Sequence, residues 1–268
     1  MRCLNLGCGD RFHSEWVNLD LHPANPSVQR WDLQDDLPFP DGSFDVVYHS
    51  HVLEHFSKAE GLRLLQRCRR ALRSDGVIRV AVPDLEQIAS LYIEALDKSL
   101  AGDPTWRTRY EWMLLEMYDQ VIRESSGGEM LAFVRRNPIP ERDFIASRIG
   151  GEFRRMTAPA SNGAVQKSEK LLSKLRNLVS RKAARLALGR QGMRAHDLGA
   201  FRMAGEVHRW MYDRYSLARA LEQAGFESPR RVGPAESAVP GWSGFGLDTE
   251  PDGSVYKPDS LFMEAIRS

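Results

Sequence analysis

The sequence predicts an α/β protein with a mostly parallel sheet and a helical insertion after its fifth strand. Along the first 84 residues, short apolar stretches alternate with helical or polar connections, and this alternation stops at about residue 85 and returns after residue 206. Strands that alternate with helices over short connections are typical of parallel sheets. We therefore expect a sheet domain formed by residues 1–84 and 207–268, interrupted by a helical insertion at 85–206.

Five strands are expected in the first part of the sheet domain. Each is a short apolar stretch that ends at an acid or a turn residue, and they lie at 3–6, 16–21, 28–33, 44–48 and 77–82. Between the last two, Ser57 and Glu60 have the spacing of a capping box, and the leucines that follow predict an amphipathic helix. Residues 74–76 are expected to end that helix.

The remaining elements are a helical insertion and the end of the sheet. Helical periodicity is seen at 88–96 and 110–122, and no stretch typical of a strand occurs between residues 85 and 206. Gly225 is suited to the C-terminus of a helix. The last part of the chain is therefore expected to contain one helix and two short strands, at 216–224, 229–232 and 261–266.

Composition and charge are those of an ordinary globular protein, with 42% hydrophobic residues, 27% charged residues and a formal net charge of +1. The three cysteines form no CxxC pair, and no histidines have the spacing of zinc ligands. We therefore expect a reducing, cytoplasmic setting with no disulfide framework and no metal site. Because the first strand begins at Cys3 and no apolar run reaches about 20 residues, we expect a soluble protein without a signal peptide.

A glycine turn, Gly7-Cys8-Gly9, follows the first expected strand directly. Glycines let the backbone come close to a ligand, and open α/β sheets bind ligands at the carboxyl ends of their strands. A turn of this kind also occurs without a ligand. By itself the turn indicates only that a ligand can approach this edge.

Two acids end the next two strands, Asp20 and Asp32. A carboxylate at the first place can accept hydrogen bonds from ribose hydroxyls, and one at the second can accept from an adenine amino group. Either acid can equally be a helix cap or a turn residue. The connection at residues 7–15 is short for a crossover helix and lacks the further glycines that bind a pyrophosphate, which argues against NAD.

The segment from Asp32 to His55, DLQDDLPFPDGSFDVVYHSHVLEH, resembles the "D…LPFPDGSFDVV…VLEH" segment of class I methyltransferases that depend on S-adenosylmethionine (SAM). The similarity is strongest to their small-molecule (type 11) group. LNLGCG resembles the first motif of that family, and residues 72–83 resemble its fifth-strand segment. The similarity covers residues 2–86 and resumes at 208–213, 221–226 and 257–266.

This resemblance implies a Rossmann-like sheet whose last strand is antiparallel, with SAM as the cofactor. It also implies a position for each cofactor-binding residue. The glycine turn would lie against the methionine part of SAM, and the acids and their neighbours would hold the ribose and the adenine. The residues implied in this way are Gly7, Cys8, Gly9, Asp20, Leu21, Asp32, Leu33 and His49.

Methyl transfer from a sulfonium requires alignment of donor and acceptor and, for a hydroxyl acceptor, removal of a proton. Histidine suits that task near neutral pH, and His51 and His208 are the candidates for the base. His55 is structural by resemblance to the family. We expect an enzyme that methylates a small molecule or a glycan, with oxygen as the acceptor atom.

The insertion is where an acceptor pocket or lid is expected. Its aromatic residues either line such a pocket or form a packed helix face; they are Trp106, Tyr110, Trp112 and Tyr118. Residues 167–194 contain nine Lys or Arg and one acid, with leucines at helical spacing, which predicts a basic amphipathic helix. That helix either packs on the domain with a solvated basic face or forms a surface for anionic lipid or a phosphate-bearing glycan carrier.

Nucleic acid is not an expected partner, because no aromatic residues alternate with the basic ones and no RNA-binding module is present. A second hypothesis for the whole chain is a SAM- or nucleotide-binding regulatory or scaffold module without catalysis, held at a membrane by the basic helix. Asp20 and Asp32 argue against decay of the cofactor site. The acceptor and the oligomeric state are not indicated by the sequence.

Overall fold

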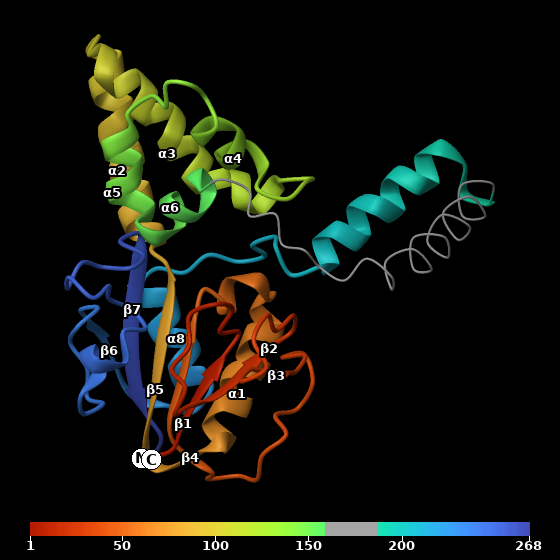
Figure 1. Cartoon of the computed structure of the whole chain (residues 1–268), viewed down its shortest axis with the longest axis vertical. Helices are drawn as coiled ribbons and strands as arrows, with labels where there is room; N and C mark the ends of the chain where they lie inside the picture. Colours follow the sequence, from red (N-terminus) through yellow and green to blue (C-terminus); the bar gives the residue numbers. More distant parts are fainter. Residues whose placement is uncertain (159–186) are drawn as a thin grey trace.

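The structure is a computed structural model that describes residues 1–158 and 187–268. A seven-stranded sheet forms the base of the molecule, and a group of helices stands on the edge where the parallel strands end (Figure 1). The strand order is β3-β2-β1-β4-β5-β7-β6, and β7 is antiparallel to both of its neighbours while the other pairs are parallel. The expected mixed, mostly parallel sheet is confirmed.

The strands of the sheet are β1 (Cys3–Leu6), β2 (Val17–Asp20), β3 (Gln29–Arg30), β4 (Phe44–Ser50), β5 (Leu72–Pro83), β6 (Glu227–Val232) and β7 (Ser260–Ile266). The helices with defined bounds are α1 (Lys58–Ala71), α2 (Leu85–Leu100), α3 (Pro104–Ile122), α4 (Gly128–Val134), α5 (Arg142–Ile149), α6 (Gly151–Thr157) and α8 (Arg214–Gln223). Two short 3-10 helices are η1 (Leu53–His55) and η2 (Trp242–Phe245).

Helix α1 begins as predicted and ends earlier than predicted. The Ser57 hydroxyl accepts a hydrogen bond from the Glu60 backbone N–H, and the Glu60 carboxylate accepts one from the Ser57 N–H, so the capping box is confirmed. The helix ends at Ala71 because buried Leu72 already pairs with Phe44 in the sheet. Residues 74–76 therefore lie inside β5 and do not form the helix stop that we expected.

One face of the sheet is covered by α1 and α8. Apolar side chains of β1, β4 and β5 pack there against buried leucines of the two helices, including Leu64, Leu65, Leu217 and Leu221. This layer is continuous and almost wholly apolar. Burial of apolar surface accounts for the packing of this face.

The opposite face is covered in a different way, because residues 7–16 form no helix between β1 and β2. The chain from residue 233 to residue 257, which includes η2, lies over this face, and its Trp242 and Leu247 join Trp16 and Tyr48 in a second buried cluster. The rings of Trp16, Tyr48 and Trp242 meet edge to face at centroid distances of 5.1–6.3 Å. On this face a loop, and not a helix, covers the apolar side chains of the sheet.

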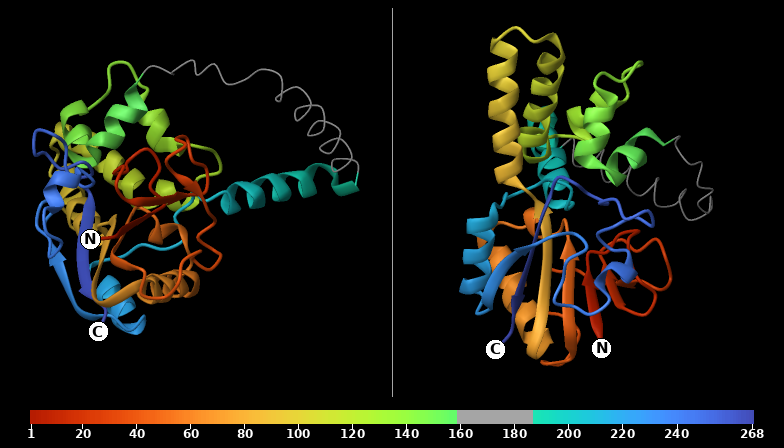
Figure 2. Two further views of the ribbon diagram at one scale, coloured as in Figure 1. Left: turned by 60° about the horizontal axis from the view of Figure 1, so that its bottom comes forward. Right: turned by 90° about the vertical axis from the view of Figure 1, so that its left-hand side faces the viewer.

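The chain leaves the sheet at Asp84 and returns at Tyr212, and these two residues form an isolated parallel bridge. Between them, α2 to α6 pack around their own core, which contains Trp112, Met113 and Phe133. This insertion stands at the end of the sheet opposite the two chain termini (Figure 2). Of its described residues, 85–158 and 187–206, none belongs to a strand.

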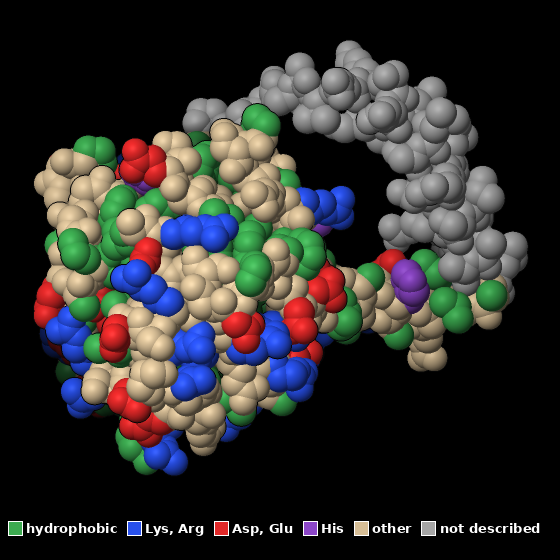
Figure 3. All heavy atoms as spheres, turned by 90° about the horizontal axis from the view of Figure 1, so that it is seen from below, with side chains coloured by type: hydrophobic (Ala, Val, Ile, Leu, Met, Phe, Trp, Pro, Cys, Tyr) green, Lys and Arg blue, Asp and Glu red, His purple; other side chains and the backbone are tan. Residues whose placement is uncertain are grey.

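The predicted basic helix falls mainly outside the described residues, since 167–186 are not described. Residues 187–203 are helical and form an arm that projects from the body of the protein (Figure 1). The underside of the sheet domain carries Lys, Arg, Asp and Glu side chains mixed together (Figure 3). Among the described residues, no helix combines the length and the apolar character needed to cross a membrane.

Candidate active site

A cavity of about 560 Å³ lies between the carboxyl edge of the sheet and the helical insertion. The glycine turn after β1 and the end of β4 line it from below, and the segment before α8 lines it with residues 204–206 and 208. Residues of α3, α4 and α6 line it from the insertion. Ligands of open α/β sheets bind at this edge.

The glycine turn has the backbone conformation that glycine makes accessible, with φ of +61° at Gly7 and +51° at Gly9. A Cβ atom on Gly7 would lie 2.5 Å from a methyl carbon of Val52, whereas one on Gly9 would meet nothing within 4 Å. Gly7 is therefore required for packing, and Gly9 faces open space. Burial raises the pKa of the Cys8 thiol to about 12, so this cysteine is an inert wall residue.

Asp20 joins the end of β2 to this turn. One carboxylate oxygen accepts the Gly9 N–H and the other accepts the His22 N–H, both at 2.8 Å. Each carboxylate oxygen has a second lone pair available to a ligand hydroxyl. The acid is thus held in place beside the turn, with capacity left for a ribose diol, and the residues present fit SAM at this point.

The other predicted cofactor residues lie farther from the cavity. Asp32 is exposed and accepts the Gln34 N–H at 2.9 Å. The side chain of Leu33 packs in the apolar layer on the face of the sheet that α1 and α8 cover. Neither these two residues nor Asp20 and Leu21 belong to the cavity lining, which ends at the glycine turn and Arg11. The positions assigned to the adenosine half of SAM stay predictions.

His49 is fully buried, and its register pairs it with Leu6 and Val80, so its side chain lies on the face that packs against α1 and α8. Burial lowers its pKa to about 4, although nearby Glu54 opposes this. The imidazole points away from the cavity. We therefore keep the predicted cofactor contact only for the backbone of His49.

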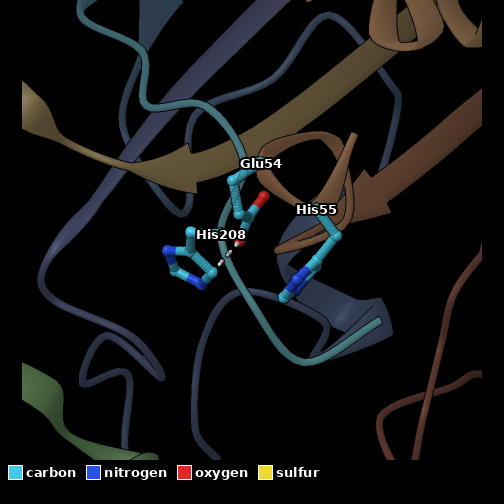
Figure 4. Close-up of side chains that lie close together, drawn as sticks. All are labelled: Glu54, His55 and His208. Carbon is cyan, nitrogen blue, oxygen red and sulfur yellow. Dashed lines mark ion pairs between the residues drawn. The ribbon is translucent and has the colours of Figure 1, made fainter. Parts of the chain in front are cut away.

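The two histidines predicted as candidate bases both lie next to the carboxylate of Glu54, a residue that the sequence analysis did not predict for the site. His51 and His208 both line the cavity, and both approach the fully buried Glu54, His51 Nδ1 at 3.3 Å and His208 Nε2 at 4.0 Å from the same oxygen. Figure 4 shows His208, Glu54 and His55 converging on one small space. The segments after β4 and before α8 together build this site.

Burial and mutual contacts together determine the pKa values of His208 and Glu54. Burial lowers the pKa of His208 to about 3 against the opposing charge of Glu54, so this imidazole is neutral at physiological pH. Burial would raise the pKa of Glu54, but its contacts with His51 outweigh this effect and hold the pKa well below its usual value. A buried carboxylate therefore lies among imidazoles.

His51 is held at both ring nitrogens. Its Nδ1 faces Glu54, and its Nε2 lies 2.7 Å from the hydroxyl oxygen of Ser260. Because a carboxylate can only accept, Glu54 favours the tautomer with hydrogen on Nδ1, which leaves the lone pair on Nε2. The backbone φ of +53° at His51, which is uncommon for a residue other than glycine, places the ring here.

The insertion contributes polar residues to the cavity. Glu152 lies 3.6 Å from Lys257 and 3.8 Å from Arg155, and these cations hold the pKa of Glu152 below its usual value although burial opposes them. Arg123 pairs with buried Asp119 at 2.5 Å. The cavity wall is thus charged on this side.

The aromatic residues of the insertion do not form this wall. Trp112 is fully buried in the core of the insertion, Trp106 and Tyr110 pack against that core, and Tyr118 is exposed. None of these four residues belongs to the cavity lining. Of the two alternatives left open by the sequence, a packed helix face describes Trp112, Trp106 and Tyr110.

Glu54 stands beside His55 in the HVLEH string, and adjacent acid and imidazole groups immediately after a strand are a signal for a polar site. The role of Glu54 in the site depends on its burial and on its contact with His208, which lies far along the chain. The HVLEH string indicates neither the burial nor this contact. The polar residues of the insertion carried no comparable signal.

Comparison with known proteins gives a family match for the N-terminal part. Residues 4–80 match the family model described as a methyltransferase domain. These residues include the glycine turn, Asp20, Asp32 and the His51–His55 segment. The matched segment thus contains the sheet side of the cavity.

A relative of similar sequence is the N-terminal Xaa-Pro-Lys N-methyltransferase 1 of Rattus norvegicus, 30% identical over 109 residues, which cover 41% of this chain and 42% of the relative. The chain thus spans less than half the length of this curated relative. Solved structures with weak similarity include a SAM-dependent methyltransferase from Archaeoglobus fulgidus, at 12% identity and a TM-score of 0.39, with coverage of 99% of this chain and 85% of the other. A SAM-dependent methyltransferase from Thermotoga maritima, titled a possible histamine N-methyltransferase, has 11% identity and a TM-score of 0.37, with coverage of 100% and 82%.

Proposed function

We propose that this chain, which carries the methyltransferase domain of the class I SAM-dependent methyltransferases, transfers a methyl group to a hydroxyl oxygen of a small molecule or glycan. SAM is the cofactor of this class, and the residues of the glycine turn and Asp20 fit it. The donor supplies a methyl group on a positively charged sulfur. The protein has to align that methyl with the acceptor and take up a proton.

The observation that carries the proposal is the position of His51. It lies in the same cavity as the glycine turn, with Glu54 fixing its tautomer and Ser260 on its lone-pair nitrogen. Ser260 does not line the cavity, so His51 would have to exchange this hydrogen bond for one from an acceptor hydroxyl, which would then donate its proton to Nε2. His208 is the weaker candidate, because its pKa of about 3 leaves it little tendency to hold a proton.

SAM would supply its sulfonium methyl group, and the acceptor oxygen would attack that carbon from the side opposite the sulfur. The C–O bond would form as the C–S bond breaks, and the electron pair of the broken bond would stay on sulfur to give S-adenosylhomocysteine. The acceptor proton passes to His51. Charge is conserved, because the sulfonium loses its positive charge as the imidazole gains one.

The character of the cavity supports a polar acceptor. Its volume of about 560 Å³ is in the range of small-molecule sites. Glu152 and Arg155 of α6 and Lys257 of the 233–257 loop line the cavity and offer both donors and acceptors to hydroxyl groups. An apolar acceptor would cover these polar groups without forming hydrogen bonds to them.

Cofactor binding is tested by calorimetric titration with S-adenosylhomocysteine. We expect binding to the wild-type chain and at least about tenfold weaker binding to Asp20→Ala, because the ribose loses a charged acceptor. Asp35→Ala, which removes an exposed acid nearby, serves as the control and should bind like the wild type. Equal affinity in all three proteins would contradict the role of Asp20.

Catalysis is tested with SAM labelled in its methyl group and a panel of polyols, glycans and peptides. We expect label in an acid- and base-stable ether, and a loss of about 100-fold or more in turnover for His51→Gln with unchanged affinity for S-adenosylhomocysteine. Label on a peptide with an N-terminal Xaa-Pro-Lys sequence, the substrate named for the rat relative, would contradict the oxygen assignment. Cofactor binding without transfer to any acceptor would favour the regulatory or scaffold module.

A further inference from the structure

A compact group of side chains that offer metal-ligand atoms lies next to the cavity, and two of its members, His55 and His208, line it. Glu54, His55 and His208 each offer one ligand atom, and these atoms all lie within 4.8 Å of one another (Figure 4). The first two residues belong to η1 and the third lies in the segment before α8. Single histidines are common in protein cores, but three convergent donors at this distance match the size of a metal coordination sphere.

The backbone fixes the two segments on each other. The Glu54 carbonyl oxygen accepts the backbone N–H groups of Arg209 at 2.7 Å and Trp210 at 3.1 Å. The His208 N–H donates to the carbonyl oxygen of Gln120 in α3. These bonds hold the ligand-bearing residues independently of their side chains, so the group is preorganised.

Buried polar atoms in this group lack partners. Within residues 1–158 and 187–268, three atoms of this group have no hydrogen bond of acceptable geometry: both carboxylate oxygens of Glu54 and Nδ1 of His208. Glu54 is fully buried and His208 is 3% exposed. His51 and His208 approach Glu54 without forming such a bond, and a buried carboxylate without a good hydrogen bond is costly, so the site calls for a further positive partner.

His55 shows the arrangement expected of a metal ligand. Its Nδ1 lies 3.4 Å from the carbonyl oxygen of Val207. A carbonyl oxygen can only accept, so this contact places the hydrogen on Nδ1 and the lone pair on Nε2. Metal-ligating histidines usually donate their other N–H to a carbonyl or carboxylate in this way.

We propose that Glu54, His55 and His208 bind one first-row divalent transition metal ion, of the type of Zn²⁺ or Mn²⁺, next to the cavity. Two imidazoles and one carboxylate are a donor set of catalytic zinc and non-haem iron sites, whereas Mg²⁺ and Ca²⁺ prefer oxygen ligands. Three protein ligands leave coordination positions open toward the cavity. His51 lies beside the site and contacts Glu54, which orients the carboxylate.

The role of the ion rests on the proposed function. A hydroxyl oxygen that coordinates the ion becomes more acidic and is held in a fixed place, so its proton leaves to His51 more readily when the methyl group is transferred. The site thereby favours acceptors with hydroxyl groups that can bind a metal ion, above all vicinal diols, which can occupy two open positions. This narrows the acceptor class to polyols and sugars.

The metal site is tested first without activity. Tag-free protein is stripped with a chelator, dialysed and titrated calorimetrically with Zn²⁺, Mn²⁺ and Mg²⁺. We expect one Zn²⁺ per chain, weaker Mn²⁺ and much weaker Mg²⁺, and a rise in unfolding temperature with Zn²⁺. Absence of saturable binding by Zn²⁺ and by Mn²⁺, or tighter binding of Mg²⁺ than of both, would overturn the proposal.

Ligand variants locate the ion. Zn²⁺ affinity should fall by about 100-fold or more in Glu54→Gln, His55→Asn and His208→Asn. His196→Asn, which changes an exposed histidine of the 187–203 helix, is the matched control and should keep the wild-type affinity. Since Glu54→Gln can fail to fold, His55→Asn is the deciding variant, because its side chain is only partly buried. Unchanged Zn²⁺ affinity in folded His55→Asn would refute the site.

Titration of the same samples with S-adenosylhomocysteine separates the two proposals. Zn²⁺ binding without cofactor binding would leave the metal site standing and contradict the methyltransferase function. Cofactor binding without Zn²⁺ or Mn²⁺ binding would support the methyltransferase function and contradict the metal site. If both bind, transfer to a polyol acceptor should fall by about 100-fold or more on removal of the ion and return when Zn²⁺ or Mn²⁺ is added.

Discussion

The two faces of the sheet are covered by different means. Helices α1 and α8 cover one face with an apolar layer that includes Leu64, Leu65 and Leu221. The loop at residues 233–257 covers the other face, where Trp242 and Leu247 pack on the strands. A helix satisfies its own backbone groups, whereas a loop lying on a sheet brings carbonyl oxygens that need donors.

Arg79 supplies those donors. It is fully buried in β5, and its guanidinium donates to the carbonyl oxygens of Gly233, Pro234 and Glu236 at 2.8–3.2 Å. It also forms ion pairs of 2.8 Å with Asp248 and Glu264. One buried cation thus holds the start of the loop and its middle, at Asp248, on the sheet.

This difference bears on the active site because the loop-covered face leads directly to the cavity. Leu247, Tyr256 and Lys257 of the loop line the cavity, whereas α1 and α8 do not. Arg11 of the sheet edge stacks on Tyr256 and pairs with Glu250 at 3.3 Å. The helix-covered face supplies stability, and the loop-covered face also positions the site.

The largest expected effect comes from Arg79→Met. Removing the cation leaves two buried carboxylates without this positive charge and takes a donor from three carbonyl oxygens, so the free energy of unfolding should fall by about 3–5 kcal/mol. Affinity for S-adenosylhomocysteine should fall as well. Urea denaturation and calorimetry measure the two quantities, and hydrogen exchange should show lost protection in residues 233–257. A loss of stability without any effect on this loop would contradict the account.

Leu65→Ala is the matched disruption of the helix-covered face. Leu65 is fully buried between α1 and the sheet, so the cavity left by the substitution should lower the free energy of unfolding by about 3 kcal/mol. Affinity for S-adenosylhomocysteine, measured under conditions where the variant is folded, should stay at the wild-type value. A selective loss of affinity here would remove the distinction between the two faces.

Ser57→Ala tests the start of α1 alone. The substitution removes the hydroxyl that accepts the Glu60 N–H and should lower the free energy of unfolding by about 1 kcal/mol. Ser57→Asp keeps a capping side chain and serves as the control. Equal stability of Ser57→Ala and the wild type in urea denaturation would show that the cap does not stabilise α1.

The smallest effect is a pH dependence at α8. The Asp213 carboxylate accepts the N–H groups of Ser216 and Tyr215, which hold its pKa below the usual value. Its contribution to stability is therefore present above the pKa of the unfolded chain and is lost as pH falls through the folded pKa. Asp213→Asn keeps a capping group without the titration. In urea denaturation, the stability difference between wild type and variant should shrink from pH 6 to pH 3; a constant difference would contradict this assignment.

The helix-covered face could be predicted because its signals are local. Ser57, Glu60 and the leucines of α1 lie within one helix, and the glycine turn and Asp20 are likewise close together in the sequence. The pairing of Arg79 with Asp248 and Glu264 joins residues 169 and 185 positions apart, which no local pattern reveals. Arg79 reads in sequence only as one polar residue in an apolar strand.

The same difference separates the parts of the active site. His51 was predicted from its place after the fourth strand and His208 from its place after the insertion, but the carboxylate between them depends on the way the two segments meet. Histidine spacing predicted no metal site, and the site that we propose is built from side chains on both sides of a long insertion, which spacing alone does not bring together. The cavity wall from α4 and α6 depends in the same way on the fold of the insertion.

The central claim is that the edge formed by the glycine turn, Asp20 and His51 is the SAM site. A crystal structure with S-adenosylhomocysteine tests it most directly. We predict the ribose hydroxyls on Asp20, the amino-acid end against Gly7–Gly9 and the sulfur in the cavity on the side of His51. Cofactor bound elsewhere, or in this cavity with its ribose away from Asp20, would contradict the account.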